Sequence, residues 1–167
     1  KNTPKLLVDH GLSPAFKSSK LNNSKFRPDS PIRIGYSGNL MHNDIDWPIL
    51  FQIISQHTDV IFEFWGPHGA KDNNLGGDIE SENIEMLQEH PNVILHGMVG
   101  QKELSEGFQL MDGFIICYDI LKGNSNGTNS HKVMEYLSSG KVIISNNMTA
   151  YRGSDLLIMS TSRKNNN

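Results

Sequence analysis

The sequence predicts an α/β protein with a Rossmann-like, doubly wound parallel sheet. Short β-branched or aromatic runs alternate with segments of helical period from residue 32 to residue 159. Several of these runs are apolar on both faces, which is typical of strands that helices cover on both sides. With 167 residues, 37% of them hydrophobic, the chain can bury a core, and one domain plus an extra segment is expected.

The extra segment is residues 1–31, which show no sustained period and are rich in Ser, Asn and Lys. We interpret it as a linker or inter-domain approach segment, which leaves residues 32–167 as the folded domain. The segment also contains four prolines: Pro4, Pro14, Pro28 and Pro31.

The first half of the domain is expected to hold three strands. A strand at about 32–37 ends in a Gly38-Asn39 turn, and a helix at about 47–57 follows, with Asp46 as its N-cap and Pro48 in its first turn. The next elements are a strand at 60–65, a loop at 67–83, a short helix near 84–90 and a strand at 92–96.

The second half continues the alternation. Its elements are a helix at 102–111, a strand at 114–119, a helix at 130–139, a strand at 141–145 and a final strand at 155–159. Cys117, the single cysteine, lies inside an apolar run, so we expect a buried strand thiol rather than a catalytic or paired one.

The helix expected at 130–139 follows a polar, Gly/Asn-rich loop. From Leu121 to Met134 the ionisable side chains are Lys122, His131 and Lys132, so this helix start carries positive charge and suits an anion. Glu135 lies one turn deeper on the same polar face, where it could accept hydrogen bonds from sugar or ribose hydroxyls. The alternative is an ordinary solvated face with a Lys/Glu pair at a spacing of three residues.

The expected topology brings this helix start to a ligand-binding edge. In the common strand order 3-2-1-4-5-6, ligands bind beyond the carboxyl ends of the strands, between the first and the fourth. The loops at that crevice would be 37–42 and 121–129, both rich in Gly and Asn. The combination favours a phosphate or sugar site there.

Several other function classes are not supported. Gly35-x-x-Gly38 lacks the dinucleotide fingerprint, and Gly140-Lys141 lacks the upstream glycine of a Walker loop. The histidines show no metal-ligand spacing, so no metal site is expected. A net charge of −3 argues against a general nucleic-acid binder.

A rival interpretation is an α/β hydrolase. Gly123-x-Ser125-x-Gly127 matches the nucleophile-elbow pattern between a strand and a helix. Four more polar residues separate Ser125 from the helix, however, and no histidine follows His131, so the triad order fails within this chain.

The run from Ser130 to Ser145 resembles the Pro-x-Lys-x-x-Glu-Tyr-Leu-Ala-x-Gly-Lys-Pro-Val-Val-x-Ser/Thr signature of the donor-binding domain of GT-B glycosyltransferases, closest to the retaining enzymes of family 4. The resemblance covers roughly 31–160, and His10–Phe16 is similar to the segment that leads from the N-terminal domain. The chain would then be one half of a GT-B fold, and its acceptor domain would be missing.

The resemblance implies roles for individual residues. Lys132 and Glu135 would be the catalytic residues, Glu135 holding the ribose hydroxyls and Lys132 or Lys122 stabilising the leaving diphosphate. Gly38 and Asn39 would approach the donor, and Met98 and Val99 would lie near the base. Asn124, Asn126, Gly127 and Thr128 would flank the sugar, and Asn129, Ser130 and His131 would face the diphosphate.

Four positions depart from the family pattern. Gly127 stands where many members have a glutamate, Asn39 and Asp44 correspond roughly to the Arg and Lys of the first loop, and Ser130 stands in place of the pattern's Pro. The changes at Gly127, Asn39 and Asp44 motivate an alternative, a GT-B-like binding module without chemistry.

The implied substrate is a UDP-, GDP- or similar nucleotide-sugar, with no cofactor and no nucleic acid as partner. The acceptor would be a glycan or lipid bound through the missing domain, in surface polysaccharide or glycan biosynthesis. The implied location is cytoplasmic, with peripheral membrane association of the full-length protein as an option. The isolated fragment is expected to be inactive, because transfer needs both halves of the site.

Overall fold

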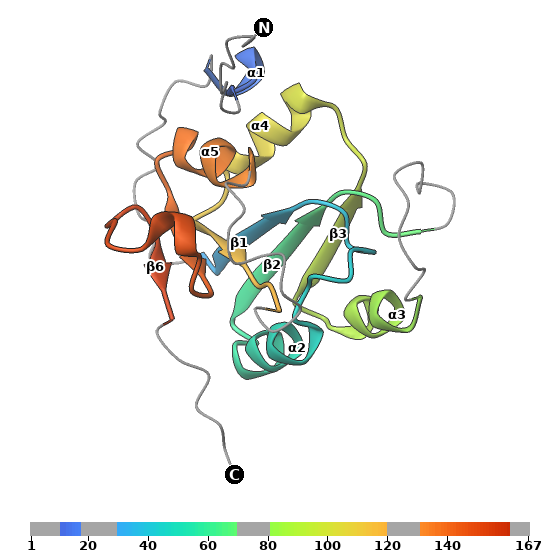
Figure 1. Cartoon of the computed structure of the whole chain (residues 1–167). Helices are drawn as coiled ribbons and strands as arrows, with labels where there is room; N and C mark the ends of the chain where they lie inside the picture. Colours follow the sequence, from blue (N-terminus) through green and yellow to red (C-terminus); the bar gives the residue numbers. More distant parts are fainter. Residues whose placement is uncertain (1–10, 18–29, 70–80, 120–130, 161–167) are drawn as a thin grey trace, which may run out of the picture.

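A computed structural model describes residues 11–17, 30–69, 81–119 and 131–160 of the chain. These residues form a six-stranded sheet in the order β3-β2-β1-β4-β5-β6, with every neighbouring pair parallel (Figure 1). The predicted α/β class and the predicted strand order are therefore confirmed.

The strands follow the apolar runs of the sequence. They are β1 Ile32–Ser37, β2 Val60–Trp65, β3 Val93–Gly97, β4 Gly113–Ile116, β5 Val142–Ser145 and β6 Ile158–Met159. Two predicted strands are too long. After β4, the Cys117 carbonyl accepts a hydrogen bond from Asp46 N at 3.1 Å, so the chain has left the parallel ladder, although Cys117 is buried as expected. Before β6, Leu156 N bonds the Ser154 hydroxyl in a turn, which leaves only two residues in the strand.

The helices begin and end within three residues of their predicted positions. They are α2 Trp47–Gln56, α3 Ser81–Glu89, α4 Gln101–Gln109 and α5 His131–Ser138. Asp46 caps α2 as predicted, because its carboxylate accepts a hydrogen bond from Ile49 N at 3.3 Å. The predicted loop 67–83 extends too far, since α3 already begins at Ser81. Within the described ranges, no helix is both long and apolar enough to cross a bilayer.

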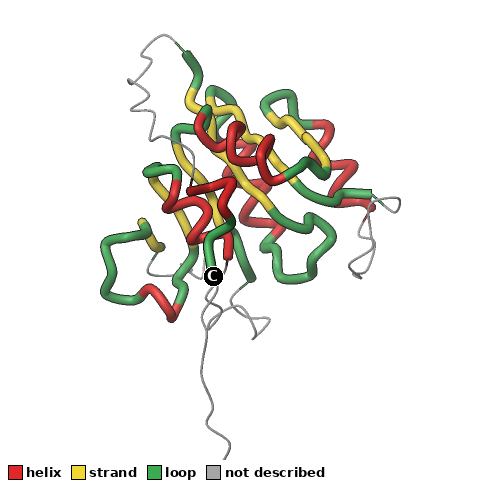
Figure 2. Tube along the Cα trace, turned by 90° about the horizontal axis from the view of Figure 1, so that it is seen from above, coloured by secondary structure: helices red, strands yellow, loops and turns green. Residues whose placement is uncertain are grey.

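Two apolar clusters hold the layers together. In Figure 1, α2 and α3 lie on one side of the sheet, and α4 and α5 lie on the other; Figure 2 gives the arrangement from above. The α2/α3 side buries Leu50, Ile54 and Leu87 against strand residues such as Tyr36 and Phe64. The opposite side is aromatic, with the core residues Phe16, Trp65, Phe108, Phe114 and Tyr136.

Residues 11–17 contain a short helix, α1 Pro14–Lys17, inside the segment 1–31 that is predicted to be a linker. Phe16 of α1 is 2% exposed and belongs to the aromatic cluster on the α4/α5 side. The 3₁₀ helix η3 Thr149–Tyr151 follows β5 and was not predicted.

One buried charge lies within the sheet. Glu63 of β2 is 3% exposed, and its two carboxylate oxygens bind different partners. Arg33 Nε on β1 donates to one oxygen at 2.6 Å, and His96 Nε2 on β3 lies 2.7 Å from the other. The network links the three strands β1, β2 and β3 through side chains as well as backbone.

Candidate functional site

A cavity of about 260 Å³ lies beyond the carboxyl ends of β1, β2 and β3. This is the edge of a parallel sheet at which α/β proteins bind ligands. Two helices complete the cavity, α4 through Leu104 and α5 through Lys132 and Glu135. The full lining is Ser37, Gly38, Trp65, Gly66, Pro67, Met98, Val99, Leu104, Lys132 and Glu135.

The cavity has two chemically different sides. One side carries a cation and a carboxylate, Lys132 and Glu135, on successive turns of α5. The other is an apolar wall, which we define as Trp65, Pro67, Met98, Val99 and Leu104. A ligand that fills the cavity would therefore need both a polar or charged part and an apolar ring or chain.

The backbone between the two sides is rigidly connected. Gly38 N donates to the Trp65 carbonyl at 2.8 Å, and Gly66 N donates to the Gly97 carbonyl at 2.8 Å, so the parallel ladder continues past the strand ends. Gly66 has a φ of +132°, and a Cβ there would collide with the Gly38 carbonyl. Only glycine allows these two backbones to approach so closely.

Lys132 turns into the fold rather than into solvent. Its ammonium donates a hydrogen bond to the Tyr36 hydroxyl at 2.9 Å and lies 4.4 Å from the centroid of the Tyr36 ring. It also lies 5.2 Å from the ring centroid of Tyr118. The alternative of an ordinary solvated face is thus wrong for Lys132. The physical reason is Gly38, because any Cβ at that position would collide with the lysine side chain.

The surroundings keep the Lys132 charge in place. Burial alone would lower the pKa of the ammonium, but the oxygens of Tyr36, Tyr118 and Tyr136 outweigh it, so the pKa is raised above its ordinary value. Burial raises the pKa values of Tyr36 and Tyr136, although Lys132 opposes this shift. At neutral pH the group is therefore a single positive charge among neutral phenols.

Glu135 lies one helical turn from Lys132 at the edge of the same cavity. Burial raises the pKa of its carboxyl group, and the charge of Lys132 opposes the shift. A half-buried carboxylate beside a cation is a good acceptor for hydroxyl groups and a poor neighbour for phosphate. The two α5 side chains are thus suited to different parts of one ligand.

Tyr136 fixes α5 to the sheet. Its hydroxyl accepts a hydrogen bond from Ser37 N at 2.7 Å, at the last residue of β1. The ring stacks on Phe114 of β4, with centroids 4.2 Å apart. Val133 and Tyr136 are fully buried, as the helical period predicts. These contacts hold Lys132 and Glu135 in place over the strand ends.

The loop after β1 contacts the segment after β4. Ile45 and Tyr118 form an isolated antiparallel bridge, and Asp119 N donates to the Asp44 carbonyl at 2.7 Å. The predicted binding crevice lies between the first and fourth strands, at the loops 37–42 and 121–129, the second of which lies outside the described residues. The cavity lies over the ends of β1, β2 and β3, next to α4 and α5.

The candidate residues from the sequence fall into three groups. Gly38, Met98, Val99, Lys132 and Glu135 line the cavity. Asn39 does not line it, since its side-chain oxygen accepts a hydrogen bond from Met41 N at 2.9 Å within its own loop, and His131 is exposed at the first residue of α5. The remaining candidates lie outside the described residues: Lys122, Asn124, Ser125, Asn126, Gly127, Thr128, Asn129 and Ser130.

Some residues that line the cavity were not predicted from the sequence. Trp65, Gly66 and Pro67 follow β2 directly, and Leu104 lies on α4. The position of Trp-Gly-Pro at the end of a strand next to β1 could have indicated them, because the carboxyl ends of neighbouring parallel strands share one edge. Tyr36 carried no such indication, since an aromatic residue in a strand is most often part of the core.

No family model and no curated protein sequence matches this chain. Among the residues that the structure describes, no three His, Cys, Asp or Glu side chains are placed to hold a metal ion. The chemistry of the cavity is therefore the basis for a functional proposal.

Proposed function

We propose that this chain is the donor-binding half of a retaining glycosyltransferase that uses a nucleotide-sugar. The observation that carries the proposal is the cavity in which Lys132 and Glu135 oppose an apolar wall at the carboxyl ends of parallel strands. The resemblance of residues 130–145 to the GT-B donor-site signature supports it.

The nucleobase, the ribose and the diphosphate of a nucleotide-sugar each have a complementary group at the cavity. The apolar wall can accept the nucleobase, with Pro67, Met98 and Val99 at the strand ends. Glu135 can accept hydrogen bonds from the ribose hydroxyls, and Lys132 with the start of α5 can bind the diphosphate. The carboxylate favours hydroxyls over phosphate because two negative charges repel each other, which gives the ligand one preferred orientation.

The same cation would assist transfer. When the bond between sugar and diphosphate breaks, negative charge develops on the departing nucleoside diphosphate, and a fixed cation stabilises that charge. Lys132 is held by Tyr36 and surrounded by phenol rings, so little reorganisation is needed as the charge develops. The acceptor, a glycan or a lipid-linked sugar, would be bound by another domain. Retention of configuration follows from the resemblance.

A second candidate is a binding module without chemistry. It is favoured by the first loop, in which Asn39 forms a turn with Met41 and Gly38 N is bonded to the Trp65 carbonyl. Neither residue therefore supplies a cation to the diphosphate, and the Gly38 N–H is already engaged. Donor turnover by the full-length protein that disappears in Glu135→Ala would exclude this candidate.

The proposal is tested by calorimetric titration of the folded chain with UDP, GDP, ADP, CDP and inorganic pyrophosphate. We expect at least one nucleoside diphosphate to bind, and Lys132→Met to weaken it by about tenfold or more, as for a hydrogen bond to a charged group. Lys102→Met is the matched control, because the Lys102 side chain is 90% exposed and its ion-pair partner among the described residues is Glu106, which is also exposed. Absence of binding for all five compounds at millimolar concentration would contradict the proposal.

A further inference from the structure

The short helix α1 and the residues before it pack on α4 and α5. Ser13 Oγ donates to the side-chain oxygen of Gln101 at 2.7 Å, and Ser105 Oγ donates to the Ala15 carbonyl at 3.1 Å. Gln101 and Ser105 both lie on α4, one turn apart. Residues 11–17 therefore hold the first half of α4 from the side that faces away from the sheet.

Phe16 is the apolar anchor of this contact. Its ring centroid lies 5.5 Å from that of Phe108 on α4, and Phe108 lies 5.8 Å from Trp65 in an edge-on arrangement. Trp65 belongs to the apolar wall of the cavity. A continuous aromatic contact thus runs from α1 through α4 to the wall.

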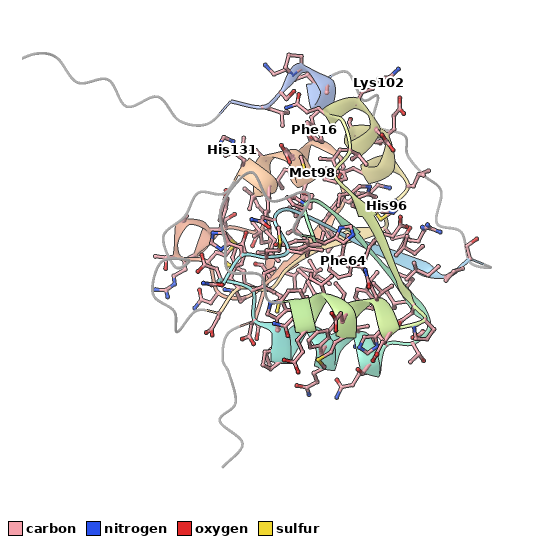
Figure 3. The ribbon with its side chains drawn as sticks, turned by 90° about the vertical axis from the view of Figure 1, so that its right-hand side faces the viewer. Phe16, Phe64, His96, Met98, Lys102 and His131 are labelled. Carbon is pink, nitrogen blue, oxygen red and sulfur yellow. The ribbon has the colours of Figure 1, made fainter. Side chains whose placement is uncertain are left out.

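Two more wall residues depend on the same cluster. Val99 and Leu104 line the cavity and also pack against the buried core that contains Phe16. Figure 3 places Phe16 and Met98 on the side of the sheet that α4 and α5 cover, with Phe64 on the other side. Met98 is 61% exposed, so its own side chain has little packing to hold it. Its position follows from the backbone on either side.

The start of α4, which follows Met98 and Val99 in the chain, lacks a side-chain cap. Gly100 is the N-cap of α4 and makes no side-chain capping hydrogen bond, whereas Ser, Thr, Asp or Asn would supply one. The hydrogen bond from Ser13 to Gln101 comes directly after this cap. This contact from a distant segment restrains the first residue of α4, although it satisfies none of the free backbone N–H groups of the helix.

We propose that α1 positions the apolar wall of the cavity, with Phe16 as the positioning residue. When α1 is docked, Phe16 and Ser13 fix the beginning of α4, and Met98, Val99 and Leu104 take the arrangement that binds an apolar ring. A ligand without such a ring does not depend on α1. The identity of the ring as a nucleobase rests on the proposed function.

The four-residue length of α1 makes this docking conditional. So short a helix is not stable by itself, so its structure depends on its contacts with the rest of the fold, among them the packing of Leu12, Ala15 and Phe16 and two hydroxyl hydrogen bonds. Removal of Phe16 should therefore release the whole segment rather than leave a local cavity. The wall of the binding site would then respond to a segment that does not itself line it.

The test measures two quantities separately: the affinity for each ligand, and the Met98 methyl resonance, which reports the position of the apolar wall. In the whole chain with ¹³C-methyl methionine, Phe16→Ala should shift the Met98 methyl resonance and leave that of Met86 unchanged. Met86 is a fair reference because it is 44% exposed on α3, on the other side of the sheet. The affinity of Phe16→Ala for UDP should be about two- to thirtyfold lower than that of the wild-type chain, the range for changes transmitted through packed neighbours. Its affinity for inorganic pyrophosphate should stay within about twofold of the wild-type value, because pyrophosphate contacts only the Lys132 side of the cavity.

Three further variants separate positioning from general destabilisation. Phe16→Leu should restore most of the UDP affinity, since it keeps an apolar anchor. Leu87→Ala removes a fully buried side chain from the α2/α3 side and should lower stability without changing UDP affinity. Ser13→Ala combined with Ser105→Ala removes both hydroxyl contacts of α1 while Phe16 stays in the aromatic cluster, and should shift the Met98 resonance even if Phe16→Ala does not fold.

The possible failures are distinguishable. If the wild-type chain binds none of UDP, GDP, ADP, CDP and pyrophosphate, the proposed function fails, while the Met98 resonance still reports whether α1 positions the wall. An unchanged Met98 resonance in both Phe16→Ala and the double serine variant overturns the inference. Equal weakening of UDP and pyrophosphate overturns it as well, because both sides of the site would then have changed.

Discussion

The ammonium group of Lys132 donates a hydrogen bond to the hydroxyl of Tyr36 across 2.9 Å. Lys132 lies on α5, on one side of the sheet, and Tyr36 belongs to the apolar cluster that α2 and α3 cover on the other side. The lysine therefore reaches over the end of β1, where Gly38 leaves room for it. This contact places a permanent charge at the base of the cavity and joins both layers of the fold.

The contact predicts a loss of stability in alkali. The pKa values of Lys132, Tyr36 and Tyr136 are all raised in the folded chain. Above about pH 10 the unfolded chain releases protons that the folded chain retains, so the free energy of unfolding falls as pH rises, by up to about 1.4 kcal/mol per pH unit for each group. Urea unfolding between pH 8 and pH 11 should show this decline, and Tyr36→Phe should make it less steep. A wild-type chain whose stability does not change over this range would contradict the raised pKa values.

Glu135 should select for ribose hydroxyls. If its carboxylate accepts their hydrogen bonds, Glu135→Gln weakens UDP binding by about ten- to a hundredfold, as for hydrogen bonds to a charged group. The same change should have little effect on 2′,3′-dideoxy-UDP or on pyrophosphate, which lack those hydroxyls. Calorimetry with the three ligands checks this, and Glu89→Gln at the end of α3 is the control. An equal loss for all three ligands would assign Glu135 a general electrostatic role instead.

The network around Glu63 should contribute to stability. Glu63→Gln removes the negative charge while Arg33 and His96 stay in place, which leaves the guanidinium without its ionic partner. We expect a loss of about 2–3 kcal/mol in the free energy of unfolding, below the usual cost of a broken buried pair because Arg33 is 30% exposed. Urea unfolding at pH 7 measures it. Glu106→Gln, whose carboxylate is 69% exposed, should cost no more than about 0.5 kcal/mol.

Gly66 should tolerate no side chain. A Cβ at its φ of +132° would collide with the backbone carbonyl of Gly38, which no side-chain rotation can relieve. Gly66→Ala should therefore lower the free energy of unfolding by at least about 2 kcal/mol. Gly69→Ala in the same loop meets nothing within 4 Å and is the matched control. Similar stability of the two variants would show that the β1 and β2 ends can separate without cost.

The sequence could predict the sheet because its information is local. A buried parallel strand needs a continuous apolar run, and a covering helix needs a period of 3.6, so both are visible in a few neighbouring residues. The 3-2-1-4-5-6 order then brings the strand ends together, which is why Gly38, Met98 and Val99 were placed correctly beside α5. Strand ends were less predictable, because β4 ends where the chain turns to pair with Asp46 and Ile45.

The sequence by itself determined the fold class, the strand order and the positions of Lys132 and Glu135 on one helix. The direction of the Lys132 side chain and the docking of α1 were decided only by the tertiary structure. Lys132 and Tyr36 are 96 residues apart, and Ser13 and Gln101 are 88 apart. Periodicity within one helix cannot show that the neighbouring strand ends in a glycine with room for a lysine side chain. Such contacts form only when separate elements pack, so the helical period places Lys132 and Glu135 on one face but cannot show that the Lys132 ammonium reaches Tyr36.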